Sequence, residues 1–402
     1  MSPLSDRTRL IAAATQRGQG RRGVNPPIER ASTMLSDSAA VMRDETDGPA
    51  YGLNGTSAAR DLRRALADLE GAKDAFLVPS GLAAVTVPLL ALLRPGDEVI
   101  TTDAVYGPTR RFLSRYQSTR GVTTRFLPAD ADAQTVLAAI GERTRLVLME
   151  SPASLTFEMV DVAAVAQACR ARGVLTVVDN TWAAGLAYRP LAHCVDVSVQ
   201  AVTKYVGGHS DVLMGSIASS NPACLRAIGD TIEDLGWHVS PDDAWLALRG
   251  LRTLPLRYAE QARSGLIVAE WLQGRPEISR VLYPPLPGSI GHDLWRRDFT
   301  GAASLMGVVM KGGDRAAGEA FLNALTLFGL GYSWGGFESL ITHETHQMAY
   351  RNDPPVLEGE LIRLHVGLED PADLIADLEQ GLAAFTAHSR FLKRRKGLCA
   401  RA

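Results

Sequence analysis

The chain has very few lysines for its size. Its 402 residues carry 42 basic side chains, yet only five of these are lysine, so arginine fills nearly every basic role. The five are Lys73, Lys204, Lys311, Lys393 and Lys396. An amine differs from a guanidinium because it can lose its proton when buried and then attack a carbonyl carbon. Lys204, isolated in the middle of the chain, is therefore either a solvated surface residue or a reactive amine.

Cysteine and net charge are also low. The four cysteines form no Cys-x-x-Cys pair, which argues against a disulfide framework or a zinc site and favours a reducing compartment. The formal net charge of −2 provides no field that would recruit nucleic acid or an anionic membrane. No apolar run reaches the ~18 residues needed to span a bilayer, and the Arg-rich N-terminus lacks the apolar core of a secretory signal. We expect a cytoplasmic protein with no nucleic-acid or membrane partner.

Two common site motifs are missing as well. His343 and His346 are spaced too closely for the His-Glu-x-x-His zinc motif, so we expect no metal site there. No Gly-x-Gly-x-x-Gly sequence follows an expected strand, which disfavours a dinucleotide site.

Apolar strands alternate with helices through the middle of the chain. Strands are expected at 75–78, 98–101, 145–149, 175–178 and 195–199, and helices at 57–71, 80–93 and 162–172. Continuous Val/Leu strands separated by helices predict an α/β fold, a mostly parallel sheet with helices on both faces. Ligands of such sheets gather at the carboxyl ends of the strands, where Asp179 ends one strand and Lys204 follows another.

The length suits one large domain and a smaller one. Residues 1–55 have little periodicity and several turn formers, so we expect an extended N-terminal arm that contacts a neighbouring subunit. Residues 56–250 form the large domain. Residues 251–402, with fewer strands in a different order, predict a smaller C-terminal α+β domain. Its expected elements are a long connecting helix around 249–263, a strand at 304–310 and helices near 316–325 and 374–385.

An amine, a carboxylate and a phosphate-binding turn together fit pyridoxal 5′-phosphate. Ser80 and Gly81 begin a buried helix, whose free N–H groups and positive dipole end suit a phosphate, although a simple N-cap has the same sequence. Asp179 is either a structural hydrogen-bond acceptor or the partner of the pyridine nitrogen. With Lys204 these groups match the three attachment points of the cofactor.

Five motifs occur in order along the chain. They are Glu150-Ser-Pro152, Asp179-Asn-Thr-Trp182, Thr203-Lys-Tyr205 with Gly208-His-Ser-Asp211, Tyr332-Ser-Trp-Gly-Gly-Phe-Glu-Ser-Leu340, and Leu361-Ile-Arg-Leu-His-Val-Gly-Leu-Glu-Asp370. From about Thr8 to Leu382 the chain resembles the trans-sulfuration (Cys/Met metabolism) family of pyridoxal phosphate enzymes, most closely the bacterial cystathionine β-lyases. The resemblance implies a fold-type I transferase-like fold and a homotetramer, a dimer of dimers with active sites shared between subunits.

The resemblance also implies a role for each site residue. Lys204 would form the Schiff base, Asp179 would pair with the pyridine nitrogen, and Tyr106 would stack on the ring and assist proton transfer. The remaining cofactor contacts would come from Ser80, Gly81, Leu82, Thr203 and Tyr51, the last from a neighbouring subunit. The substrate would be held by Arg363 at its α-carboxylate, with Ser333, Trp334 and Tyr51 around it.

Two residues depart from the family pattern. Leu53 stands where the family usually has an arginine that binds the cofactor phosphate across the subunit interface. Either Asn54 or Arg60 compensates, or phosphate affinity is weaker than in the family. Ala201 replaces the serine that usually precedes the Thr-Lys pair.

The expected activity is that of a carbon–sulfur β-lyase acting on an amino acid. By α,β-elimination it would convert L-cystathionine and water to L-homocysteine, pyruvate and ammonia. Three alternatives stay open: a γ-acting relative, namely a cystathionine γ-synthase or γ-lyase; a lyase for another cysteine conjugate; and a non-catalytic regulatory protein derived from the fold.

Overall fold

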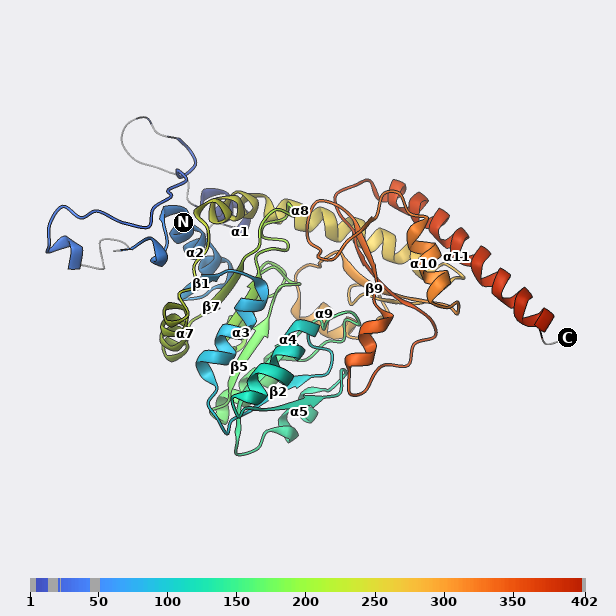
Figure 1. Cartoon of the computed structure of the whole chain (residues 1–402), viewed down its shortest axis with the longest axis horizontal. Helices are drawn as coiled ribbons and strands as arrows, with labels where there is room; N and C mark the ends of the chain where they lie inside the picture. The colour runs from blue at the N-terminus through green and yellow to red at the C-terminus, as the bar shows by residue number, and fades with distance from the viewer. Residues whose placement is uncertain (1–4, 14–20, 22, 44–50, 400–402) are drawn as a thin grey trace.

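Two β-sheets organise the molecule, as the computed structural model shows in Figure 1. The structure describes residues 5–13, 21, 23–43 and 51–399. The larger sheet has seven strands in the order β1-β7-β6-β5-β4-β2-β3. Their bounds are β1 Asp74–Val78, β2 Glu98–Thr102, β3 Thr123–Leu127, β4 Thr144–Glu150, β5 Leu175–Asp179, β6 Val197–Ala201 and β7 Gly215–Ser219.

The larger sheet is mostly parallel, as predicted. Strands β3, β2, β4, β5 and β6 run in the same direction, and β7 is antiparallel to both of its neighbours, β6 and β1. The sequence pattern predicted neither β7 nor β3. All five predicted strands of this part are present within a few residues of their expected bounds.

Helices cover both faces of this sheet, which confirms the predicted layers. One face packs on α3 (Gly81–Leu92) and α7 (Pro222–Asp234), and the other on α2 (Ser57–Glu70), α6 (Val162–Ala171) and α8 (Pro241–Gln273). Alternate residues of one strand enter the two cores: Leu146 and Leu148 join the α3 side, and Val147 joins the α8 side. Such strands are buried on both faces, which explains their continuous apolar sequence.

Four shorter helices and turns flank the strands of the larger sheet. They are α4 (Gly107–Arg111), continued by the π-helical turn η4 (Phe112–Gln117), α5 (Ala133–Ala139) and the 3₁₀ turn η5 (Pro190–His193). Helix α4 follows β2 directly. It therefore starts at the carboxyl edge of the sheet, where β5 and β6 also end.

The smaller sheet has five strands in the order β10-β11-β12-β9-β8. Its elements are β8 Ile278–Leu282, α9 His292–Asp298, β9 Leu305–Met310, α10 Arg315–Asn323, β10 Gly329–Leu330, β11 Leu340–His343, η6 Thr345–Tyr350, β12 Leu361–His365 and α11 Pro371–Cys399. Helix α8 links the two sheets in one rod, and the expected domain boundary after residue 250 lies within this helix.

The N-terminal arm contains one helix that the sequence pattern did not predict. Helix α1 (Asp6–Ala12) is capped by Ser5 and packs on α8 and α2, and its Leu10 is buried in the main core. Beyond it, the described part of the arm extends away from the body in Figure 1; η1 (Val41–Arg43) lies far from the body, and η3 (Gly52–Asn54) precedes α2. Among the described residues, none of the helices is long and apolar enough to cross a membrane.

Candidate active site

Lys204 lies just beyond β6 at the carboxyl edge of the larger sheet. Its Nζ donates a hydrogen bond to Ser333 Oγ at 2.7 Å and lies 5.2 Å from the centre of the Trp334 ring. Burial and the nearby Arg363 guanidinium lower the pKa of Lys204 to about 8, against a smaller opposing effect of Asp179. About a tenth of this amine is therefore uncharged at pH 7, far more than of an ordinary lysine, and the uncharged form is the one that a nucleophile or base requires.

Asp179 ends the neighbouring strand β5. Its Oδ1 accepts hydrogen bonds from the Thr181 backbone N–H at 3.0 Å and from the Thr181 hydroxyl at 2.5 Å. Burial raises the pKa of Asp179, while those two hydrogen bonds and Lys204 oppose the rise. Because β5 and β6 are adjacent and parallel, the sheet brings this carboxylate and Lys204 to the same edge.

The first turn of α3 lies directly against the end of β6. Ser80 caps this helix by accepting a hydrogen bond from the Ala83 N–H, as its sequence predicted. A Cβ at Gly81 would lie 2.4 Å from the Ala201 Cβ, so only glycine allows this approach. The N–H groups at the start of a twelve-residue helix thus lie beside the strand that leads to Lys204, where a phosphate would be stabilised.

Two predicted cofactor contacts have a different setting in this chain. The Thr203 hydroxyl donates to the Met214 carbonyl at 3.2 Å and accepts from the Met214 N–H at 3.0 Å, so it must leave that carbonyl to donate to a phosphate. Tyr51 is 53% exposed, forms a bridge with Thr33, and has no described contact with Lys204. Leu53 lies beside it in η3 and is partly buried.

Tyr106 caps α4 at the same edge of the sheet. Its backbone N–H donates to Glu150 Oε2 at 2.7 Å, and its side chain is 43% exposed. Burial, then the Glu150 charge, raise the pKa of the Tyr106 phenol, against a smaller effect of Arg363. Burial, then Asp179, raise the pKa of Glu150 well above its ordinary value. The Tyr106 hydroxyl consequently keeps its proton at neutral pH and is suited to donate it.

Arg363 reaches the site from β12 of the smaller sheet. Its Nη2 donates a long hydrogen bond to the Ser333 carbonyl at 3.5 Å and lies 3.7 Å from Glu344 Oε1. Burial lowers the pKa of Arg363, and the fully buried Glu344 opposes this effect. Glu344 is itself held by the Thr342 hydroxyl at 2.6 Å and by the Gln347 amide.

Ser333 connects the two halves of the site. It touches Lys204 through its hydroxyl and Arg363 through its carbonyl. Its φ of 95° is in the left-handed region, a strained conformation for a non-glycine residue that costs about 1–3 kcal/mol. The next residue, Trp334, packs edge-on against the Tyr205 ring with centroids 5.6 Å apart.

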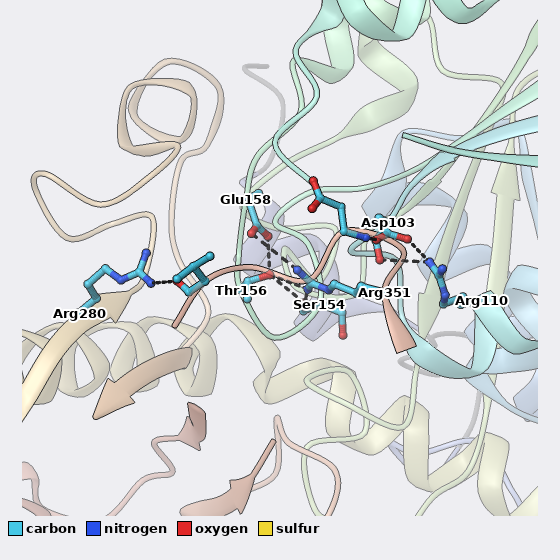
Figure 2. Close-up of polar contacts among 9 residues, drawn as sticks. Asp103, Arg110, Ser154, Thr156, Glu158, Arg280 and Arg351 are labelled. Carbon is cyan, nitrogen blue, oxygen red and sulfur yellow. Dashed lines mark hydrogen bonds and ion pairs between the residues drawn. The ribbon is translucent and has the colours of Figure 1, made fainter. Parts of the chain in front are cut away.

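A buried arginine fixes the segment after η6 to the larger sheet (Figure 2). Arg351 Nη2 donates to the Ser154 carbonyl at 3.0 Å and to the Thr156 hydroxyl at 2.6 Å. Glu158, which accepts from Thr156 at 2.5 Å, lies 3.9 Å from Arg351 Nη1. Burial lowers the pKa of Arg351, while Glu158 provides the largest opposing effect.

The same segment also touches the turn that carries Tyr106. Asp103 pairs with Arg110 across that turn and accepts the Asp353 N–H at 2.9 Å, and Arg110 also donates to Asn352 at 2.8 Å. Figure 2 shows the Asp103–Arg110 pair. Together with the contacts to Asn352 and Asp353, it joins the segment that follows η6 to both ends of the Tyr106 turn.

Removing the Arg351 guanidinium should destabilise the protein strongly. Arg351→Met leaves the carboxylate of Glu158 buried without its cation, and such losses cost about 3–5 kcal/mol. The free energy of unfolding, measured by urea denaturation, should fall by that amount. The matched control is Arg280→Met, because Arg280 makes a comparable pair with Glu358 near the surface, worth about 1 kcal/mol or less. Equal losses in the two variants would contradict this view of Arg351.

The sequence motifs contained several of these residues without indicating their roles. Glu150 and His365 stand in two of the five motifs, but their partners come from distant parts of the chain. Glu344 and Arg351 had no local signal, since each is polar in a polar segment. The remaining expected residues, apart from Tyr51, gather at one edge of the larger sheet.

Fold and site together define an α/β enzyme that uses pyridoxal phosphate. The groups present fit this cofactor: an amine with a lowered pKa, a carboxylate on the adjacent strand, and a helix N-terminus that lies against the end of β6. A Cβ at position 81 would prevent this approach by clashing with Ala201. A sequence model of the family described as Cys/Met metabolism PLP-dependent enzyme matches residues 7–383. The chain belongs to this family.

Individual relatives agree with this assignment. A putative cystathionine β-lyase of Rhizobium johnstonii is 43% identical over 372 residues, covering 90% of this chain and 92% of the relative. The cystathionine β-lyase MetC of Escherichia coli is 39% identical over 389 residues, covering 94% and 98%. Among solved structures, the cystathionine γ-synthase of Xanthomonas oryzae superimposes with a TM-score of 0.90 at 30% identity, covering 96% of this chain and all of that one.

Proposed function

We propose that this protein is a carbon–sulfur β-lyase that converts L-cystathionine and water to L-homocysteine, pyruvate and ammonia. The single observation that carries the proposal is the set of contacts at Ser333 and Trp334: the Lys204 amine bonds the Ser333 hydroxyl and faces the Trp334 ring, and the Arg363 guanidinium bonds the Ser333 carbonyl. The names of the relatives at 39–43% identity support the same reaction.

The cofactor, when bound, supplies an electron-accepting ring that makes the Cα proton of an attached amino acid acidic. Lys204 would hold its aldehyde carbon, Asp179 its ring nitrogen, and Ser80, Gly81 and Leu82 its phosphate. Tyr106 would lie against its ring. Thr203 and the partner copy's Tyr51 complete the proposed set.

Arg363 binds the substrate first in this scheme. A guanidinium and a carboxylate form a bidentate pair that fixes orientation as well as position. Ser333, whose carbonyl accepts a hydrogen bond from Arg363, would lie beside the bound carboxylate. Holding the carboxylate at Arg363 decides which Cα bond faces Lys204, so that proximity selects the reaction.

Lys204 and Tyr106 then move protons. Once its amine is free, Lys204 takes the proton from Cα, which its lowered pKa allows. The carbon–sulfur bond at Cβ breaks, and the thiolate leaves with a proton from Tyr106 or from Lys204. Tyr106, whose pKa is raised, keeps its proton at neutral pH and so has one to give. Trp334 would contact the distal half of the substrate.

Product analysis tests this reaction against its closest rival. The purified holoenzyme is incubated with L-cystathionine, and the 2-oxo acid is identified by chromatography. β-Elimination yields pyruvate, whereas γ-elimination yields 2-oxobutyrate. Pyruvate as the main product supports the proposal. 2-Oxobutyrate as the main product would assign the chain to the γ-acting relatives, of which the Xanthomonas structure is one.

We also propose that the active form is a homotetramer built as a dimer of dimers in the cytoplasm. The exposed Tyr51, which the family pattern assigns to a neighbouring site, supports at least a dimer.

A further inference from the structure

His365 occupies a position behind the site that the proposed mechanism does not use. It ends β12, two residues after Arg363, and is 1% exposed. Its ring lies between two parts of the chain, the strand entry at Ser304 and the loop at Gly335. Both ring nitrogens have partners, so its hydrogen bonds define its protonation.

The Gly335 backbone N–H donates to His365 Nε2 at 3.0 Å. Nε2 must therefore be unprotonated, and the proton resides on Nδ1, which donates to Ser304 Oγ at 3.1 Å. The Ser304 hydroxyl in turn donates a hydrogen bond to the Val366 carbonyl at 2.6 Å. The Gly336 carbonyl, 3.3 Å from Nε2, already accepts a hydrogen bond from Gln261, so it does not require a donor from the histidine.

Burial keeps this imidazole neutral. It lowers the pKa of His365 to about 3, and the nearby charges of Arg363 and Lys204 act in the same direction. In a protonated ring Nε2 would also carry a hydrogen, so it could not accept the hydrogen bond from the Gly335 N–H. The ring is thus a neutral acceptor at any pH well above 3.

Gly335, whose N–H is bound by His365, lies in the loop that carries Ser333 and Trp334. Gly335 has φ 82°, and a Cβ there would lie 2.8 Å from the Tyr205 N, so the loop runs directly over the backbone of Lys204 and Tyr205. Ser333, two residues earlier, is in a strained left-handed conformation. Such a conformation persists only where surrounding contacts hold it.

We propose that His365 is a positioning residue for substrate specificity, which acts by accepting the Gly335 N–H and so fixes Ser333 on Lys204 and Trp334 beside the Lys204 amine. This inference rests on the proposed function for its substrate, in which Trp334 would contact the distal half of cystathionine. The effect passes through the loop, and His365 itself touches neither substrate nor cofactor.

Two substitutions test the roles of the two ring nitrogens separately. In His365→Gln the amide oxygen lies as many bonds from the backbone as Nε2, so it can still accept from Gly335. In His365→Asn the shorter amide reaches only the Nδ1 position, so it keeps the Ser304 contact and loses the Gly335 bond. The control is His292→Asn in α9, where a histidine bonds only the Pro284 carbonyl at 2.8 Å, outside the site.

Two measurements on the holoenzymes follow the loop. The first is the ratio of kcat/KM for L-cystathionine to that for S-methyl-L-cysteine, which lacks a distal half. The second is the visible circular dichroism of the bound cofactor, which needs no substrate. We expect His365→Asn to lower the ratio about tenfold and to change the dichroic band, His365→Gln to stay near wild type, and His292→Asn to change neither.

A milder variant keeps the test decisive if His365→Asn does not fold. Ser304→Ala removes the acceptor that holds the Nδ1 proton and so weakens the tautomer that accepts from Gly335. It should shift the ratio and the band in the same direction by a smaller amount. Wild-type ratio and band in the folded variants would overturn the proposal, as would equal losses in His365→Asn and His365→Gln. Failure of the wild type to release pyruvate would instead refute the β-lyase function, and the dichroic band would still decide the role of His365.

Discussion

Lys204→Ala is expected to lower kcat with L-cystathionine by about 10⁴-fold or more, the upper range for a positioned proton-transfer group. The alanine variant loses both the amine that would hold the cofactor and the base at Cα. Lys204→Arg provides the matched control, because it keeps the charge and much of the volume but cannot lose its proton. If the reaction needs only a cation at this position, Lys204→Arg will be active. If it needs an amine, both variants will be inactive.

The pH dependence of the wild type provides a second check on Lys204. The pKa of Lys204 is lowered to about 8, so the fraction of free amine rises as the pH is raised through that value. We expect kcat to rise over the same range, measured with saturating substrate and cofactor. The control is Lys73, which directly precedes β1, the edge strand of the larger sheet that lies two positions from β6. Lys73→Ala should leave the pH profile unchanged.

Arg363→Met is expected to lower kcat/KM by about 30- to several-thousand-fold. Loss of one partner of a buried, hydrogen-bonded charge pair costs about 2–5 kcal/mol, and every 1.4 kcal/mol is about tenfold. The methionine also leaves the Glu344 carboxylate facing the substrate carboxylate, which adds repulsion. Arg363→Lys keeps the charge without the two-pronged geometry, so its loss should be intermediate.

A double variant separates these contributions. Arg363→Met combined with Glu344→Gln removes the uncompensated carboxylate while leaving the guanidinium absent. Its kcat/KM should exceed that of Arg363→Met alone, and the difference measures the repulsion. Steady-state kinetics with L-cystathionine gives both values. A wild-type kcat/KM in Arg363→Met would show that the carboxylate binds elsewhere.

The larger sheet could be predicted because its information is local. Val and Leu runs separated by helices specify a parallel sheet, and a parallel sheet places the residues after β5 and β6 at one edge. The proximity of Asp179 and Lys204 followed from that rule alone. The capping role of Ser80 was equally local, since it depends on an N–H three residues away.

The parts that escaped prediction depend on contacts between distant segments. Strand β7 is a short Gly-Ser-Ile-Ala-Ser sequence with no strand pattern of its own, and its pairing with β1 and β6 defines it. The role of Arg351 depends on its hydrogen bonds to Ser154 and Thr156, which lie almost two hundred residues earlier. Helix α1 likewise forms where its Leu10 can be buried against α8 and α2.

His365 shows the same limit within a motif. Its place beside Arg363 was visible in the sequence, but its acceptor role depends on the left-handed turn at Gly335 and on the tautomer set by Ser304. Neither can be derived from residue type. The replacement of the family arginine by Leu53 is the opposite case, plain in the sequence and not explained by the described contacts of a single chain.

The most direct test of the account is to find which amine carries the cofactor. Borohydride treatment of the holoenzyme fixes a pyridoxal group to the amine that holds it, and peptide mass spectrometry then locates the added mass. With five lysines in the chain, the result is unambiguous. The label is expected on the peptide that contains Lys204. A label on another lysine, or none on any, would contradict it.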